Sequence, residues 1–145
     1  MLDSAALQSR APRTSLTVPM LTLLVVEAAT FFLAASLHQG LQIPLGFAVL
    51  AEPPIMPATI VETLCGLTLA TAAIAVGAGW RWARVVAIAA HLFSIGGVAL
   101  GMVALAAGRG PRTELNSTYH LTIMLVMLAG LAILATPAAR AALRR

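Results

Sequence analysis

Two acids and three histidines lie within otherwise apolar stretches of the sequence, and their side chains are the ones best suited to chemistry. The acids are Glu27 and Glu62, and the histidines are His38, His91 and His120. Carboxyl and imidazole groups act as general acids and bases, and they also bind zinc, iron or manganese. Which of these roles the five side chains can perform depends on the structural elements that position them.

The composition indicates that these elements are membrane spans. Of the 145 residues, 60% are hydrophobic and 10% are charged. Soluble domains carry about 25% charged residues, because their surface must be solvated. Disordered chains are poor in Leu, Ile and Val, so this composition excludes them as well. The single cysteine, Cys65, excludes an internal disulfide and any site built from several thiolates.

Four stretches are long and apolar enough to cross a membrane, which takes about 20 residues. They are residues 17–37, 55–79, 85–107 and 117–136. None shows the alternation of a barrel strand, so helices are expected. The first stretch exceeds the apolar region of a signal peptide and contains Glu27, so we interpret it as an uncleaved span. We predict an all-α membrane protein with one domain, residues 1–145, forming a four-helix bundle.

The arginines predict the orientation of this bundle. Arg109 and Arg112 lie between the last two spans, and the other seven of the nine basic residues lie on the opposite side. By the positive-inside rule, we expect both termini to be cytoplasmic and the spans to lie in the inner (plasma) membrane of the cell. The net charge of +4 then reflects topology and contact with anionic lipid, not nucleic-acid binding. The seven are Arg10, Arg13, Arg81, Arg84, Arg140, Arg144 and Arg145.

The connection between the first two spans, residues 37–54, is itself apolar. Glycines and prolines interrupt it too often for a fifth span. We predict a re-entrant or interfacial segment that caps the bundle on the outer side. Loops of this length tend to be functional.

Most of the polar groups are expected to lie under this loop. A rise of about 1.5 Å per residue places Glu27 ~16 Å, Glu62 ~10 Å and His120 ~5 Å below the outer boundary. His38 lies at that boundary, and His91 lies ~24 Å down. Four of the five groups therefore share the outer half, which predicts a polar pocket there.

Several chemistries suit such a pocket. Glu62 and Glu27 are candidate catalytic acid and base residues, and His120, His38 and Tyr119 are candidate ligand contacts. The ligand would be a small lipophilic molecule such as a quinone, and the same acids would also serve a proton relay. A metal held by Glu62, His120 and His38 is a further candidate, but no helix carries a paired ligand motif.

Other interpretations assign these residues no chemistry of their own. Haem needs two histidines at similar depth, whereas the same count separates His91 and His120 by roughly 19 Å. The cofactor, metal or haem, is therefore left unknown. The acids can also be protonated and join helices, as in a non-enzymatic accessory or assembly subunit of a membrane complex. His91 is interpreted as a packing histidine.

Small residues allow close contacts between helices, within the chain or between chains. Glu62 shares a helix face with Gly66, and the third span contains the pattern Gly97-x-x-x-Gly101. These faces permit a homodimer or a partner in a membrane complex.

The second span and the turn after it resemble the DoxX-like proteins, which are small four-span bacterial membrane proteins. The resemblance rests on Glu62-x3-Gly66, an apolar run ending Gly77-x-Gly79, and then Arg81 and Arg84. By layout it covers roughly residues 17–107, while the three histidines lie outside its pattern. It implies a membrane component of a thiol- or quinone-linked redox assembly, without catalytic residues to carry over.

Overall fold

Four long helices form the body of the molecule in a computed structural model, which describes residues 16–143. They are α1 (Thr17–Leu37), α2 (Met56–Ala78), α3 (Ala83–Ala106) and α4 (Glu114–Ala135). A short helix, α5 (Pro137–Ala142), follows α4, and two short strands, β1 (Ile43–Pro44) and β2 (Val49–Leu50), lie between α1 and α2. Each long helix is long and apolar enough to span a membrane.

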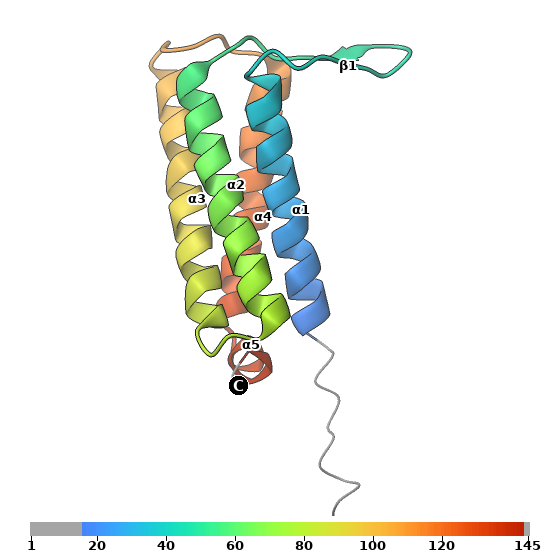
Figure 1. Ribbon diagram of the computed structural model, residues 1–145. Coiled ribbons are helices and arrows are strands. Elements are labelled where there is room, and N and C mark those ends of the chain that lie inside the picture. Colours follow the sequence, from blue (N-terminus) through green and yellow to red (C-terminus); the bar gives the residue numbers. More distant parts are fainter. Residues whose placement is uncertain (1–15, 144–145) are drawn as a thin grey trace, which may run out of the picture.

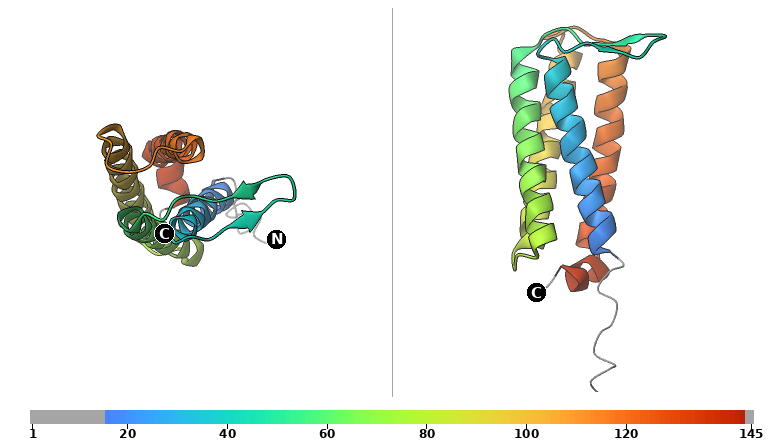
Figure 2. Two further views of the ribbon diagram at one scale, coloured as in Figure 1. Left: turned by 90° about the horizontal axis from the view of Figure 1, so that it is seen from above. Right: turned by 45° about the vertical axis from the view of Figure 1, so that its right-hand side comes forward.

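The helices run up and down, and neighbours in sequence pack side by side (Figures 1 and 2). α1 and α4 contact each other much less extensively than consecutive long helices do. We call the end with β1 and β2 the hairpin end, and the end with the α2–α3 turn the turn end. Arg10, Arg13, Arg144 and Arg145, used in the orientation argument, lie outside the described residues.

The helix ends agree with the predicted spans within three residues, and local hydrogen bonds explain the differences. α2 ends at Ala78, and the capping residue Gly79 has a φ of 65°, a left-handed conformation that favours glycine. α4 begins earlier than predicted, because the Thr113 hydroxyl accepts a hydrogen bond from the Asn116 N–H at 3.0 Å and caps the helix. Asn116 therefore belongs to the first turn of α4.

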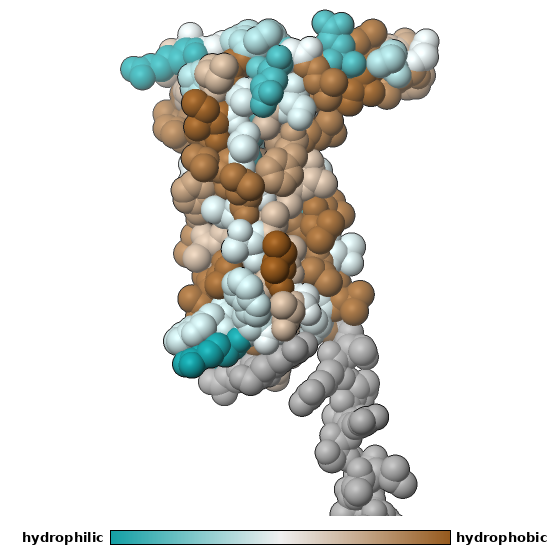
Figure 3. All heavy atoms as spheres, in the orientation of Figure 1, coloured by the Kyte–Doolittle hydropathy of each residue, from teal (hydrophilic) through white to brown (hydrophobic). Residues whose placement is uncertain are grey.

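Apolar side chains face outward along most of the bundle, while several polar ones are buried. Large exposed hydrophobic residues occur on all four long helices, including Val25, Leu67, Leu92 and Leu125. Figure 3 shows brown, apolar atoms along the length of the visible face and teal, hydrophilic atoms at its ends. An outward apolar surface with a partly polar interior is the arrangement that a lipid solvent favours.

The connection between α1 and α2 is a small β-hairpin that extends sideways from the bundle (Figures 1 and 2). Ile43 pairs with Leu50 and Pro44 with Val49 in antiparallel register. Its two ends meet where the Ile55 N–H donates to the His38 carbonyl at 3.0 Å. The hairpin does not descend between the helices, so the re-entrant form of the predicted segment is not observed.

Candidate functional site

Glu62 and His38 form the centre of a polar cluster at the hairpin end. Their side chains are buried, and His38 Nε2 lies 3.7 Å from Glu62 Oε1. The other ring nitrogen of His38, Nδ1, lies 3.2 Å from the Pro53 carbonyl, to which it can donate. The imidazole thus links the end of α1, the hairpin connection and α2. The sequence placed both residues in the outer half, and the structure brings them together.

Glu52 joins this cluster from the connection, although the sequence analysis assigned it no role. Its carboxylate is buried and accepts from the Thr113 hydroxyl, at 2.7 Å to Oε1 and 2.8 Å to Oε2. Because Thr113 also caps α4, the connection is tied directly to the start of that helix. An acid beside a Pro-Pro pair was the sequence signal, but it did not identify the partner.

His120 lies on α4 beside the same region. Its Nδ1 is 2.8 Å from the Asn116 carbonyl, which is an acceptor, so in the neutral ring Nδ1 carries the proton. Nε2 then remains as an acceptor and lies close to Gly101, where an added Cβ would be 2.8 Å from it. Gly101 therefore leaves the space that this imidazole occupies.

A cavity of about 150 Å³ adjoins these groups between α2, α3 and α4. Glu62 and His120 belong to its lining, which is otherwise mostly apolar and includes Leu100, a residue 61% exposed on the outer face of α3. Two further exposed lining residues, Pro57 and Arg109, lie at the hairpin end, so the opening of the cavity lies between the outer face of α3 and that end. We call it the hairpin-end cavity; its lining is Phe31, Ile55, Pro57, Ala58, Val61, Glu62, Gly97, Val98, Leu100, Gly101, Ala104, Leu105, Arg109, Gly110, Asn116 and His120.

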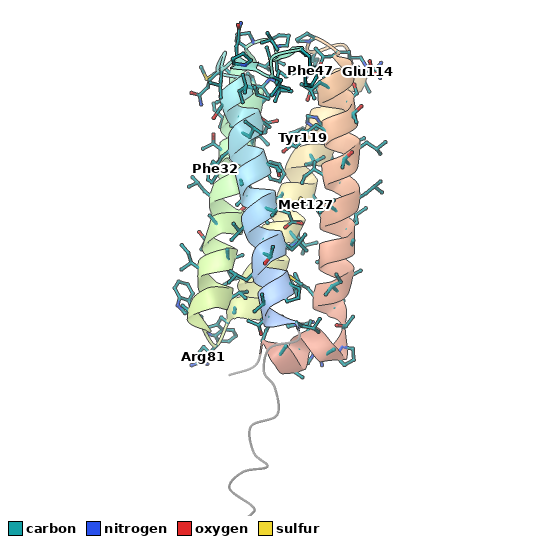
Figure 4. The ribbon with its side chains drawn as sticks, turned by 90° about the vertical axis from the view of Figure 1, so that its right-hand side faces the viewer. Phe32, Phe47, Arg81, Glu114, Tyr119 and Met127 are labelled. Atoms are coloured by element: carbon teal, nitrogen blue, oxygen red, sulfur yellow. The ribbon has the colours of Figure 1, made fainter. Side chains whose placement is uncertain are left out.

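Tyr119 lies on the other side of the cluster, between α4 and α1 (Figure 4). Its ring makes edge contacts with Phe31 and His120, at centroid distances of 6.3 Å and 5.6 Å. It lines a second cavity of about 140 Å³, together with His38 and Glu52. Tyr119 and His38, both predicted ligand contacts, therefore face this second cavity rather than the hairpin-end cavity.

Glu27 lies apart from Glu62 and pairs with His91. Glu27 Oε2 is 3.3 Å from His91 Nε2, and both side chains are at most 1% exposed. His91 Nδ1 lies 2.8 Å from the Ala87 carbonyl, which accepts its proton. The residue count instead groups Glu27 with Glu62 and predicts a packing role for His91. Counting residues gives depth only for parallel, untilted helices, so it did not predict the Glu27–His91 contact.

The metal and haem alternatives gain no support from this arrangement. Within residues 16–143, no three His, Cys, Asp or Glu side chains come together as a metal site. His91 contacts Glu27 deep in the bundle, whereas His120 lines the hairpin-end cavity.

The predicted small-residue faces are used inside the chain. An added Cβ at Gly97 would lie 2.8 Å from Cys65 Sγ, and one at Gly66 would lie 2.9 Å from the Phe32 ring. These glycines allow α3 and α1 to approach α2 closely. They therefore explain contacts between helices of one chain and give no support to a homodimer.

Comparison of the chain with protein-family models, curated proteins and solved structures finds no match in any of the three. The resemblance to the DoxX-like proteins stays a prediction.

Proposed function

We propose that this multi-pass membrane protein binds a small lipophilic molecule with a polar ring, such as a quinone, in the hairpin-end cavity. The observation that carries the proposal is the cavity itself, which combines a largely apolar wall with Glu62 and His120. Ligand sites of this kind use apolar walls for affinity and a few polar groups for orientation. Leu100, which lines the cavity and is exposed on the apolar face of α3, suits a ligand that arrives through the lipid.

The size and chemistry of the cavity favour a ring with oxygen substituents. An apolar cavity of about 150 Å³ holds a benzene-sized molecule, and the hairpin-end cavity has a similar volume. Both carboxyl oxygens of Glu62 are buried without a hydrogen-bond partner. A ligand hydroxyl or carbonyl would satisfy them, depending on whether the carboxyl is ionised or protonated. His38, beside Glu62, is placed to exchange a proton with it.

The roles of the candidate residues follow from their positions. Glu62 is the proposed acid or base, His120 the proposed ligand contact and His38 a positioning residue behind Glu62. Glu27 does not line the cavity and contacts His91 instead, so the proposal gives it no contact with the ligand.

Native mass spectrometry of the detergent-purified chain tests this function, with decyl-substituted benzoquinone as the probe. We expect one probe molecule per chain, and at least about tenfold weaker binding in Glu62→Gln and His120→Ala. A tenfold change corresponds to about 1.4 kcal/mol, which is within the range of one hydrogen bond to a buried polar group. Glu114→Gln, at an exposed acid on the same end, is the control. Equal binding by all four proteins would refute the proposal.

A second function, a non-enzymatic accessory subunit, is favoured by one observation. Both polar pairs join different helices, α1 with α2 through His38–Glu62 and α1 with α3 through Glu27–His91. Such contacts between helices stabilise membrane bundles. For this function, Glu62→Gln lowers the stability of the bundle, and the unmodified chain binds no probe.

We further propose that the hairpin end faces the outside of the inner (plasma) membrane and that both termini are cytoplasmic. Arg81, Arg84 and Arg140 lie at the turn end, as the positive-inside rule requires. The hairpin would then rest in the outer interface, where its apolar tip residue Phe47, 90% exposed, enters lipid.

Labelling of intact cells with a membrane-impermeant maleimide tests this orientation. In a Cys65→Ala background, Gln42→Cys on the hairpin should be labelled from outside. Arg140→Cys on α5 should be labelled only after the cells are permeabilised. The reverse pattern would show that the orientation is wrong.

A further inference from the structure

Unpartnered polar atoms gather inside the bundle. In the described part of the chain, eight buried side-chain nitrogen and oxygen atoms make no hydrogen bond, and two of them, Glu27 Oε2 and His91 Nε2, face each other at 3.3 Å. A buried polar group without a partner costs about 1–3 kcal/mol, so such atoms are usually satisfied by water. The atoms belong to Glu27, Thr59, Glu62, His91, Ser94 and Tyr119.

Most of these residues follow one another along facing sides of α2 and α3. On α2, Thr59, Glu62 and Cys65 are buried at intervals of three residues, which places them on one face. On α3, His91 and Ser94 have the same spacing and are fully buried.

The two faces meet at Gly97, one turn beyond Ser94, because a Cβ there would lie 2.8 Å from Cys65 Sγ. His91, one turn from Ser94 in the other direction, contacts Glu27 on α1. We call the series Thr59, Glu62, Cys65, Ser94, His91 and Glu27 the polar column.

The polar column is open to the hairpin end and closed toward the turn end. Glu62 lines the hairpin-end cavity. Beyond Glu27 and His91, the buried side chains of the described residues toward the turn end are apolar; they include Leu24, Val76, Ala87 and Leu134, each at most 1% exposed. Among the buried side chains of the described residues, polar ones therefore occur only on the hairpin side of the Glu27–His91 pair, while at the turn end the half-buried Arg84 donates to the Leu134 carbonyl.

We propose that water and protons enter the polar column from the hairpin end and reach the Glu27–His91 pair, which holds an exchangeable proton. This inference does not depend on the proposed ligand. It assigns a proton site to the interior of the bundle, with access from one side of the membrane.

The chemistry of the pair follows from the ring contacts of His91. Nδ1–H donates to the Ala87 carbonyl, so Nε2 is the atom that faces Glu27 Oε2. One proton taken from water is shared between these two atoms, and the pair is then neutral. The proton returns to water by the same route. The other titratable groups around the route are Glu62 and Cys65 on α2, His38 after α1, Arg109 between α3 and α4, Tyr119 and His120 on α4, and Glu52 of the α1–α2 connection.

Infrared spectroscopy after transfer of the detergent-purified chain from H₂O to D₂O tests the proposal. The vibrational bands of the pair are identified by their loss in Glu27→Gln, and those of Glu62 by their loss in Glu62→Gln. We expect the Glu27 bands to shift faster than the backbone amides of α1 exchange.

Two substitutions of Ser94 by residues of nearly the same shape test the route of the protons along the polar column. Ser94→Val and Ser94→Thr add similar volume, but only threonine keeps the hydroxyl. We expect Ser94→Val to slow the shift of the Glu27 bands at least about tenfold relative to Ser94→Thr, while the Glu62 bands shift as before. Thr71→Val, at an exposed position of α2, is the control for the substitution itself.

Two results would overturn the inference. In the unmodified chain, the Glu27 bands could shift no faster than the α1 amides exchange. This result would show that water does not reach the Glu27–His91 pair. Equal rates in Ser94→Val and Ser94→Thr would show that protons do not pass this position. The first measurement needs no variant to fold, so a failed substitution does not remove the test.

Discussion

Removing both members of the Glu27–His91 pair should destabilise the bundle by less than the sum of the losses caused by removing each member alone. Glu27→Leu leaves His91 Nε2 buried without its neighbour, and His91→Leu leaves the Glu27 carboxyl in the same state, because both side chains are at most 1% exposed. We expect each single variant to lower the free energy of unfolding by about 1–3 kcal/mol. The double variant replaces both groups with apolar ones and should lose less than the sum.

Reversible unfolding in mixed detergent and dodecyl sulfate micelles measures this double-mutant cycle. A coupling energy of at least about 1 kcal/mol is expected, near the upper part of the range for contacts between membrane helices. Glu114→Leu at an exposed position should change stability by less than about 0.5 kcal/mol. A loss in the double variant equal to the sum of the two single losses would contradict the prediction, since independent side chains show no coupling.

Filling the hairpin-end cavity should abolish binding of the benzoquinone probe without changing any charged group. Ala104 lines the cavity and is half-buried, so a phenylalanine there would occupy space that the ligand needs. The cavity volume of about 150 Å³ leaves little room for both a phenyl ring and a quinone ring. We expect Ala104→Phe to lower affinity at least about tenfold, while the chain keeps its helical content.

Ala106→Phe is the matched control, two residues along α3 at an exposed position that is not part of the lining. The measurement is the probe occupancy in native mass spectra, with circular dichroism as the check on folding. Loss of binding in both variants would point to a general disturbance of α3. Unchanged binding in Ala104→Phe would place the ligand elsewhere. Together with Glu62→Gln, this variant separates the contribution of the cavity from that of the acid.

The four spans could be predicted from the sequence because the requirement is local. A membrane helix satisfies its own backbone hydrogen bonds, so a stretch of sufficient length and hydropathy is enough to predict it. The structure has four helices of this kind, at Thr17–Leu37, Met56–Ala78, Ala83–Ala106 and Glu114–Ala135. The hairpin was harder to predict, because its two ends are joined by a hydrogen bond between Ile55 and His38, which are 17 residues apart in the sequence.

The candidate site was predicted only in part. The clustering of polar groups in one half of the bundle drew attention to Glu62, His38 and His120, which do lie at the hairpin end. Glu52 was not predicted, because its partner Thr113 is 61 residues away. The Glu27–His91 pair was also not predicted, because helix tilt and side-chain length decide which residues at different depths come into contact.

The sequence by itself therefore determined the apolar character of this protein, the four helices of residues 16–143 that are long enough to span a membrane, and the few ionisable groups inside them. These properties follow from composition and from the length of apolar stretches, which are features of the chain alone. Only the tertiary structure decided that Glu27 and Glu62 each lie beside a histidine and that an apolar cavity adjoins Glu62. Such contacts depend on the rotation and tilt of helices, which packing sets and periodicity does not.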